Sequence, residues 1–328
     1  MTLRDKVTKA MLDYATIPAE KVHSSAYPFY YKDYADNLYM RMGHQALQAY
    51  ENGSGSETKP YTWNGNGKTV KCPPKMASIA SSSAMTFNLL GDGPAKILPN
   101  SSLPTATYQV QYEKQMYPLC IRGYAPANLD VFLSNETEKT AIFCEMKLLE
   151  WLNEPGTLKD SYRDSLWYFP SDDTAVSCPV AAFPIFQKVI EEIELAAFQR
   201  YDAWQMLKHL LAIYHYTSIT SQKWVDTFRK IPSMAGKYNR IILVNVVNEF
   251  PPERIGDISV RDDYWEALEE EKDEAQRFMK IIQASGMAHL FDNNCNAGIE
   301  VKYMSAKDFA ACLDISQAKK DYLKRYFT

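Results

Sequence analysis

Two apolar segments that lie close together in the chain decide the fold: NLDVF at residues 128–132 and AIFCEMK at residues 141–147. Residues 135–140 between them are polar and turn-like. Two apolar strands joined by so short a turn are expected to pair. Each segment also carries charged side chains, which are costly to bury unless they are paired or bound to a metal ion. The hairpin therefore predicts both the centre of a sheet and a candidate site.

The charged residues of this hairpin are expected to share one face of the sheet. Side chains alternate along a strand, so Glu145 and Lys147 point to one side and Cys144 and Met146 to the other. Asp130 on the preceding strand can face the same cleft as Glu145 and Lys147. The alternation thus predicts two carboxylates and one ammonium group in a single place.

That set of groups suits phosphodiester hydrolysis. Two carboxylates hold a hard divalent ion such as Mg²⁺ through oxygen ligands. The ion activates water and stabilises charge on the phosphate. The lysine can orient or deprotonate the attacking water and oppose the developing negative charge.

The Glu-x-Lys triplet alone is a weak signal, because the chain contains it four times, beginning at Glu57, Glu145, Glu270 and Glu300. Only the Glu145 copy ends an apolar strand and follows a second strand with a lone Asp130. The alternative interpretation of this copy is a surface hairpin with a Glu–Lys cross-strand pair.

The rest of the chain predicts one α/β domain over residues 1–328, since no repeat or low-complexity linker divides it. The run RIILVNVVN at 240–248 is typical of a strand buried on both faces. Residues 60–75 are expected to form a loop, and residues 153–183 are irregular. Strands are expected at 107–115, 128–133, 140–149, 240–248 and 299–304. Helices are expected at 1–15, 33–50, 81–90, 186–216 in one or two pieces, 262–285 and 313–327.

The net charge and the cysteines limit the classes of function and the location that are expected. The net charge is −4, which argues against a basic nucleic-acid binder, although bound metal ions reverse the local field of an acidic site. The six cysteines do not have the spacing of metal ligands, so a zinc site is not expected. They are expected to be buried free thiols. Without an apolar run of about 18 residues, neither a membrane span nor a signal peptide is expected, and the default location is the cytoplasm.

Several segments in their order resemble the PD-(D/E)XK nuclease superfamily, in particular a bacterial branch of restriction-endonuclease-like proteins. The resemblance covers about residues 35–250, and the tail at about 253–328 lies outside it. It implies a restriction-endonuclease-like core, with a mixed central sheet flanked by helices and extra N- and C-terminal helices. The matching segments are GSGSE at 53–57, MASIASSSAMTFNLL at 76–90, ANLD at 127–130, EMKLLEW at 145–151, QMLKH at 205–209 and the strand at 240–248.

The resemblance also implies roles for five residues. Asp130 and Glu145 would be metal ligands, Lys147 the catalytic lysine, Glu57 an additional carboxylate ligand, and Gln205 a residue lining the cleft. The implied activity is hydrolysis of nucleic-acid phosphodiesters, DNA in the first place, with Mg²⁺ or Mn²⁺. A homodimer would be consistent with cutting both strands. One departure is Leu129, which stands where the family name has proline.

Each of the less certain residues has a plainer interpretation. Glu57 follows a Gly/Ser turn and can equally be a solvated loop carboxylate. Tyr201, Gln205 and Lys208 share a helix face that either lines the cleft or meets solvent. His209, six residues from the next histidine, is interpreted as a packing or surface residue.

Three other functions stay open at this stage. The first is a nucleic-acid- or protein-binding module on the same fold that has lost the chemistry, against which the complete set of Asp130, Glu145 and Lys147 argues. The second is an unrelated α/β protein whose hairpin carries these charges by chance. The third is another metal-dependent phosphoesterase, but the His-rich ligand sets usual in that class are missing from the sequence.

Overall fold

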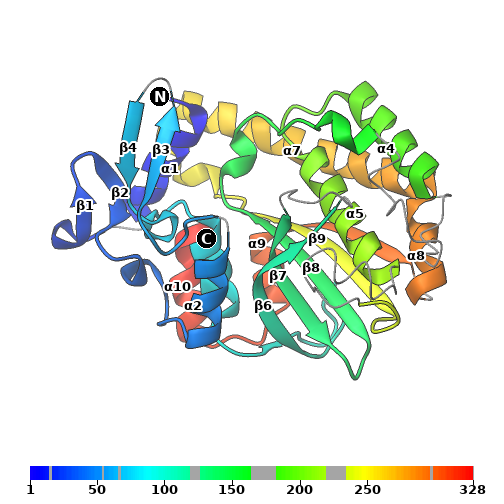
Figure 1. The fold of residues 1–328 in the computed structure, drawn as a ribbon. Helices are drawn as coiled ribbons and strands as arrows, with labels where there is room; N and C mark the ends of the chain where they lie inside the picture. Colours follow the sequence, from blue (N-terminus) through cyan, green and yellow to red (C-terminus); the bar gives the residue numbers. More distant parts are fainter. Residues whose placement is uncertain are drawn as a thin grey trace.

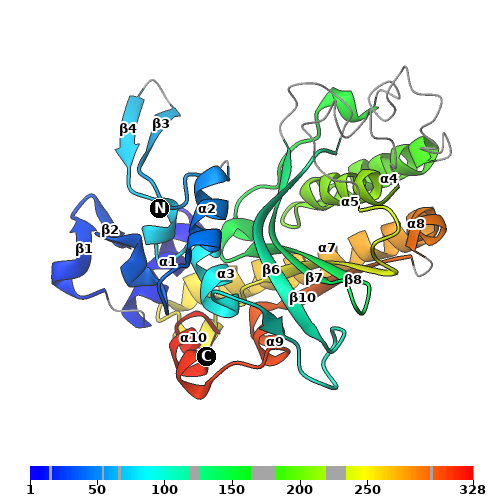
Figure 2. The ribbon, with the colours of Figure 1, turned by 60° about the horizontal axis from the view of Figure 1, so that its bottom comes forward.

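The fold, in a computed structural model, is a curled six-stranded sheet with helices on both faces (Figures 1 and 2). The structure describes residues 1–14, 17–53, 55–65, 68–118, 126–163, 182–218, 234–295 and 298–327. In this part of the chain no helix is long and apolar enough to span a membrane.

The sheet is mixed, with the strand order β10-β9-β8-β7-β6-β5. The meander β6-β7-β8 is antiparallel, whereas β9 runs parallel to β8 and β10 parallel to β9. The predicted meander and the doubly buried strand are therefore confirmed, and the strand expected at 299–304 lies at the edge. The bounds are β5 (Ala95–Lys96), β6 (Thr107–Met116), β7 (Ala127–Asn135), β8 (Thr140–Lys147), β9 (Arg240–Val247) and β10 (Ile299–Ser305).

Two apolar layers cover the two faces of the sheet. Cys144 and Met146 of β8 pack in one layer with α1, α3 and α10, while Phe143 packs in the other with α4, α5 and α8. Alternation along β8 is thus confirmed, and it turns Glu145 and Lys147 toward α5. The helices of these layers are α1 (Leu3–Tyr14), α3 (Ser82–Leu90), α4 (Ala182–Ala196), α5 (Ala203–Ser218), α8 (Met287–Cys295) and α10 (Gln317–Phe327).

One long helix, α7 (Ile258–Ser285), belongs to both layers. Its first half contributes Tyr264 and Leu268 to the α3 layer, and its second half contributes Ala275 and Phe278 to the α5 layer. Glu271 lies between these halves and is 1% exposed. The change of layer therefore places an acidic residue in the interior beside the sheet.

The region before the sheet departs from the sequence prediction in two places. A helix over 33–50 is wrong, because Asp33 caps a short 3₁₀ turn at Tyr34–Asn37 and the helix α2 (His44–Asn52) begins only after Gly43. A loop over 60–75 is also wrong, because β3 (Tyr61–Gly65) and β4 (Lys68–Cys72) pair as a hairpin. The Asn/Gly signals that suggested a loop are equally those of a tight hairpin turn.

The end of the chain is part of the same unit. β10 extends the sheet, and α9 (Ala306–Ala311) follows it directly; neither α8 nor α9 was expected. In α3, the buried Asn88 side chain donates a hydrogen bond of 2.8 Å to the Tyr326 hydroxyl of α10. The tail beyond residue 253 thus completes the sheet and covers α3.

Candidate active site

The site begins where β7 and β8 stop pairing. The ladder between them runs from Asn135–Thr140 to Val131–Cys144 and ends there. Leu129 and Phe132 pack in the same layer, so strict alternation along β7 breaks at Asp130. The Asp130 carboxylate instead accepts a hydrogen bond of 2.7 Å from the backbone N–H of Met146. This bond holds Asp130 beside the segment of β8 that carries Glu145 and Lys147.

Glu145 is the centre of a closed group of side chains, which we call the Glu145 cluster: Glu145, Lys147, Gln205 and His209. Lys147 Nζ lies 2.8 Å from Glu145 Oε1, and Gln205 Nε2 donates to the same oxygen at 2.8 Å. His209 Nε2 lies 3.0 Å from Glu145 Oε2. Lys147 Nζ also donates to Gln205 Oε1 at 2.6 Å. Both oxygens of Glu145 therefore have partners, two of them one turn apart on α5.

The charges of the cluster are set by burial and by each other. Burial opposes ionisation of Glu145, but the charge of Lys147 and the hydrogen bond with His209 outweigh it and lower the pKa of Glu145 to about 2. Burial also opposes the charge on Lys147, yet Glu145 raises the Lys147 pKa above its ordinary value. The pair is thus an ionised carboxylate and an ammonium group at neutral pH.

Asp130 has the opposite electrostatics. Burial, followed by the negative charges of Glu145 and Glu113, raises the pKa of Asp130 well above its ordinary range. Two neighbouring carboxylates whose pKa values move apart are typical of functional sites. A cation bound at Asp130 would favour its ionised form, because an opposite charge nearby lowers the pKa of a carboxyl group.

Two further acids, Glu113 and Glu57, extend this group of interacting carboxyl groups. Glu113 has a left-handed backbone (φ 51°), and burial together with the charges of Glu57 and Glu145 raises its pKa to about 8. Glu57 is 7% exposed, lies 3.8 Å from Lys75, and has a pKa raised mainly by burial. Glu57 is therefore not a solvated loop residue. It interacts with Glu113 through its charge, and its ion pair is with Lys75 rather than with the Glu145 cluster.

The turn at residues 53–57 makes room for these two acids. A Cβ on Gly53 would lie 2.8 Å from Glu113 Oε2, and a Cβ on Gly55 would lie 2.2 Å from Glu57 Oε1. A side chain at either position would require the facing carboxylate to shift. Gly53 and Gly55 thus lie against the carboxylates of Glu113 and Glu57, respectively.

The donor set fits a magnesium-type ion better than a tightly caged metal. Among the described residues, no group of three or more His, Cys, Asp or Glu side chains is arranged to hold a metal ion. Mg²⁺ commonly uses one or two protein carboxylates and completes its shell with water and substrate phosphate oxygens. Asp130 and Glu145 can supply two such carboxylates, provided that Glu145 exchanges one of its present partners for the ion.

A cavity of about 310 Å³ adjoins the Glu145 cluster. Its walls come from the end of β8, the segment 150–156, the start of α5, β9 and α7. Gln205, which the resemblance predicts to line the catalytic cleft, is one of the residues in its wall. Of the other two residues on the predicted face, Tyr201 is buried and Lys208 donates to the Thr157 carbonyl at 3.4 Å.

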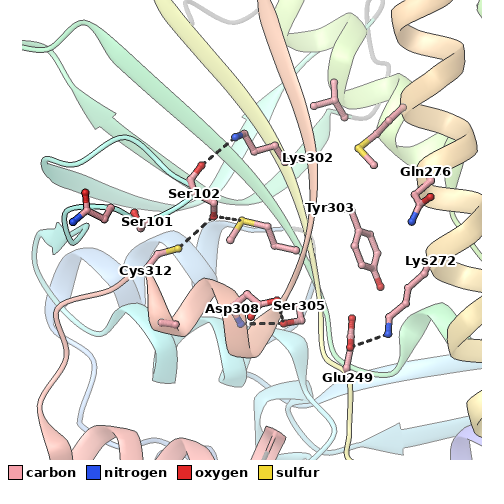
Figure 3. Close-up of a pocket in the computed structure, with 15 residues that line it drawn as sticks. Ser101, Ser102, Glu249, Lys272, Gln276, Lys302, Tyr303, Ser305, Asp308 and Cys312 are labelled. Carbon is pink, nitrogen blue, oxygen red and sulfur yellow. Dashed lines mark hydrogen bonds and ion pairs between the residues drawn. The ribbon is translucent and has the colours of Figure 1, made fainter.

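A larger cavity of about 790 Å³ lies elsewhere, along β10 and α7 (Figure 3). Its charged groups already pair nearby: Lys272 with Glu249 at 3.1 Å, and Lys302 with the Ser102 carbonyl at 3.0 Å. It contains none of the residues of the Glu145 cluster. Size alone therefore does not make it the better candidate for the active site.

Sequence reasoning missed two members of this region, His209 and Glu113. His209 is 1% exposed and contacts Glu145, so it is not a surface residue. Its spacing of four residues from Gln205, already assigned to the cleft, was the available signal. Glu113 carried no signal, because only the strand register brings it opposite Asp130.

Comparison with known proteins adds no relative: no protein-family model, no curated protein and no solved structure matches this chain.

Proposed function

We propose that the chain is a metal-dependent nuclease that hydrolyses phosphodiester bonds, most suitably in DNA. The observation that carries this proposal is the Glu145–Lys147 pair, with side chains 5% and 17% exposed, beside Asp130 at the point where β7 and β8 part. The element order α3, β6-β7-β8, α4 and α5, then β9 parallel to β8, also follows the order that the PD-(D/E)XK resemblance implies.

Each of these residues has a distinct proposed role. Asp130 and Glu145 would hold Mg²⁺ or Mn²⁺, which supplies an activated water and neutralises charge on the phosphate. Lys147 keeps its proton next to Glu145, so its role is to oppose negative charge on the phosphate rather than to abstract a proton. Gln205 bonds both Glu145 and Lys147 and fixes their separation.

A second candidate is a binding module without catalysis. The observation in its favour is that Lys147, Gln205 and His209 already occupy both oxygens of Glu145. In that case the cluster would be a structural ion pair. The two candidates differ in one measurable property, which is cleavage that depends on a divalent ion.

The test is incubation of linear, circular and single-stranded DNA with the full-length protein in Mg²⁺, Mn²⁺ or EDTA. Wild type is compared with Asp130→Asn, which keeps the size of the side chain but removes its charge. We expect metal-dependent cleavage by wild type and at least a hundredfold loss in Asp130→Asn, in the range found on removal of one electrostatic group from an active site. Cleavage of no substrate by wild type would favour the binding module.

A further inference from the structure

The 310 Å³ cavity beside the Glu145 cluster contains two buried hydrogen-bond acceptors without partners. Glu271 is 1% exposed and Asn245 is 4% exposed, and both line the cavity. Glu271 Oε2 and Asn245 Oδ1 have no hydrogen-bond partner in the described part of the protein. Leaving such a group unpaired costs about 1–3 kcal/mol, so its retention in the interior requires an explanation.

The position of these acceptors ties them to the candidate active site. Asn245 is the register partner of Glu145 in the parallel ladder of β8 and β9, so the two side chains lie on the same face of the sheet. Glu271 comes from α7 between its two apolar halves. The cavity is thus lined by the Glu145–Lys147 pair as well as by Asn245 and Glu271.

The chemistry of the acceptors selects the ligand. Two oxygens that lack donors would be satisfied by a ligand that presents N–H groups. The volume of about 310 Å³ lies at the lower end of the range for small-ligand pockets, roughly 300–1,000 Å³.

Trp151 also lines the cavity, although it is only 4% exposed and its ring contacts Tyr264. Enzymes that take a base out of the stack commonly hold it by hydrogen bonds to its edge and by stacking on aromatic or apolar side chains. Carboxylates accept hydrogen bonds from the exocyclic amino group of cytosine, and amide side chains recognise adenine.

We propose that this cavity binds one nucleobase through an edge that carries an amino group, with Glu271 and Asn245 accepting its hydrogen bonds. The inference rests on the proposed function, because it treats the ligand as part of a nucleic-acid substrate. It predicts a preference for adenine, cytosine or guanine over thymine, which has no amino group.

The test is binding of dAMP, dCMP, dGMP and dTMP to the full-length protein in EDTA at pH 9, measured by calorimetry and tryptophan fluorescence. Burial raises the pKa of Glu271 to about 8, so at pH 9 its carboxylate is ionised and can only accept hydrogen bonds. We expect at least one amino-bearing nucleotide to bind about tenfold more tightly than dTMP. Glu271→Gln and Asn245→Ala should each reduce this preference severalfold. Glu266→Gln is the matched control, because Glu266 lies on α7 outside the cavity.

Equal binding of all four nucleotides, binding of none, or an unchanged preference in Glu271→Gln would overturn the inference. Thermal unfolding of each variant shows that it is folded, and Glu271→Gln is suitable because it replaces a buried carboxyl with a neutral group of the same shape. Short oligonucleotides that end in dC or dT then distinguish a base within a chain from a free nucleotide. The assay needs no cleavage, so nucleotide discrimination without nuclease activity would refute the proposed function alone.

Discussion

Two copies of the same triplet, Glu-x-Lys, lie on two strands of one sheet and behave differently. On the central strand β8, the side chains of Glu145 and Lys147 are 5% and 17% exposed, whereas on the edge strand β10 those of Glu300 and Lys302 are 36% and 27% exposed. Each pair forms an ion pair, at 2.8 Å in β8 and 3.3 Å in β10. The sequence is alike, so the position in the sheet makes the difference.

The neighbours of the two copies differ as well. Glu145 has Gln205 and His209 from α5 and lies beside Asp130, while Glu300 has the half-exposed Arg240 at 2.7 Å. A salt bridge at the surface contributes little to stability, whereas a buried pair is costly to break. The comparison therefore makes Lys302 and Glu300 natural controls for Lys147 and Glu145.

The largest expected effect is on stability. Glu145→Ala removes the carboxylate that pairs with Lys147. It should lower the free energy of unfolding by about 3 kcal/mol. This is the lower end of the range for breaking a buried pair, because Lys147 keeps its hydrogen bond to Gln205. Glu300→Ala should cost about 1 kcal/mol or less. Urea denaturation at neutral pH measures both. Equal losses in the two variants would contradict the contrast between the two copies.

A second prediction concerns pH and the acids around the buried copy. Burial, followed by the charge of Glu274, raises the pKa of Glu271 from an ordinary 4.5 to about 8. The folded state binds this proton more tightly than the unfolded state, so the contribution of Glu271 to stability is complete below pH 4.5. It is lost as the pH rises toward 8. At about 1.4 kcal/mol per pKa unit the loss is on the order of a few kcal/mol.

Glu271→Gln should therefore flatten the decline in stability between pH 4.5 and 8, as measured by urea denaturation across that range. The pKa of Glu300 in the edge copy shifts in the opposite direction: although burial opposes it, Arg240 lowers this pKa. Glu300→Gln should therefore remove stability above pH 4.5 rather than add it. If the Glu271→Gln variant had the same dependence of stability on pH as the wild type, a raised pKa of Glu271 would be contradicted.

The smallest expected effect comes from His209. His209→Ala removes one partner of Glu145 and should reduce metal-dependent cleavage about tenfold, equivalent to about 1.4 kcal/mol in the barrier. His209→Gln can donate a hydrogen bond from its amide and should recover most of that activity. The ratio of the two variants in steady-state kinetics is the readout. If His209→Ala cleaved as fast as His209→Gln, His209 would only fill space.

The sequence was sufficient for five of the six strands of the sheet, but not for the short edge strand β5 or for the whole site. Alternation with a period of two predicted the face of Glu145 and Lys147, because strand geometry is local. His209 and Glu113 depend on how α5 is rotated against β8 and on the register between β6 and β7, which arise only from packing. The hairpin at residues 61–72 was missed because turn residues mark a loop and a hairpin equally well.

The most direct test of the central claim compares cleavage of circular DNA in Mg²⁺ by wild type, Lys147→Ala and Lys302→Ala. Both variants remove a lysine from the same triplet in the same sheet. If the Glu145 copy is catalytic, Lys147→Ala should reduce the cleavage rate roughly 10²–10³-fold, while Lys302→Ala should keep it within about twofold. Equal rates in the two variants, with both folded, would contradict the account.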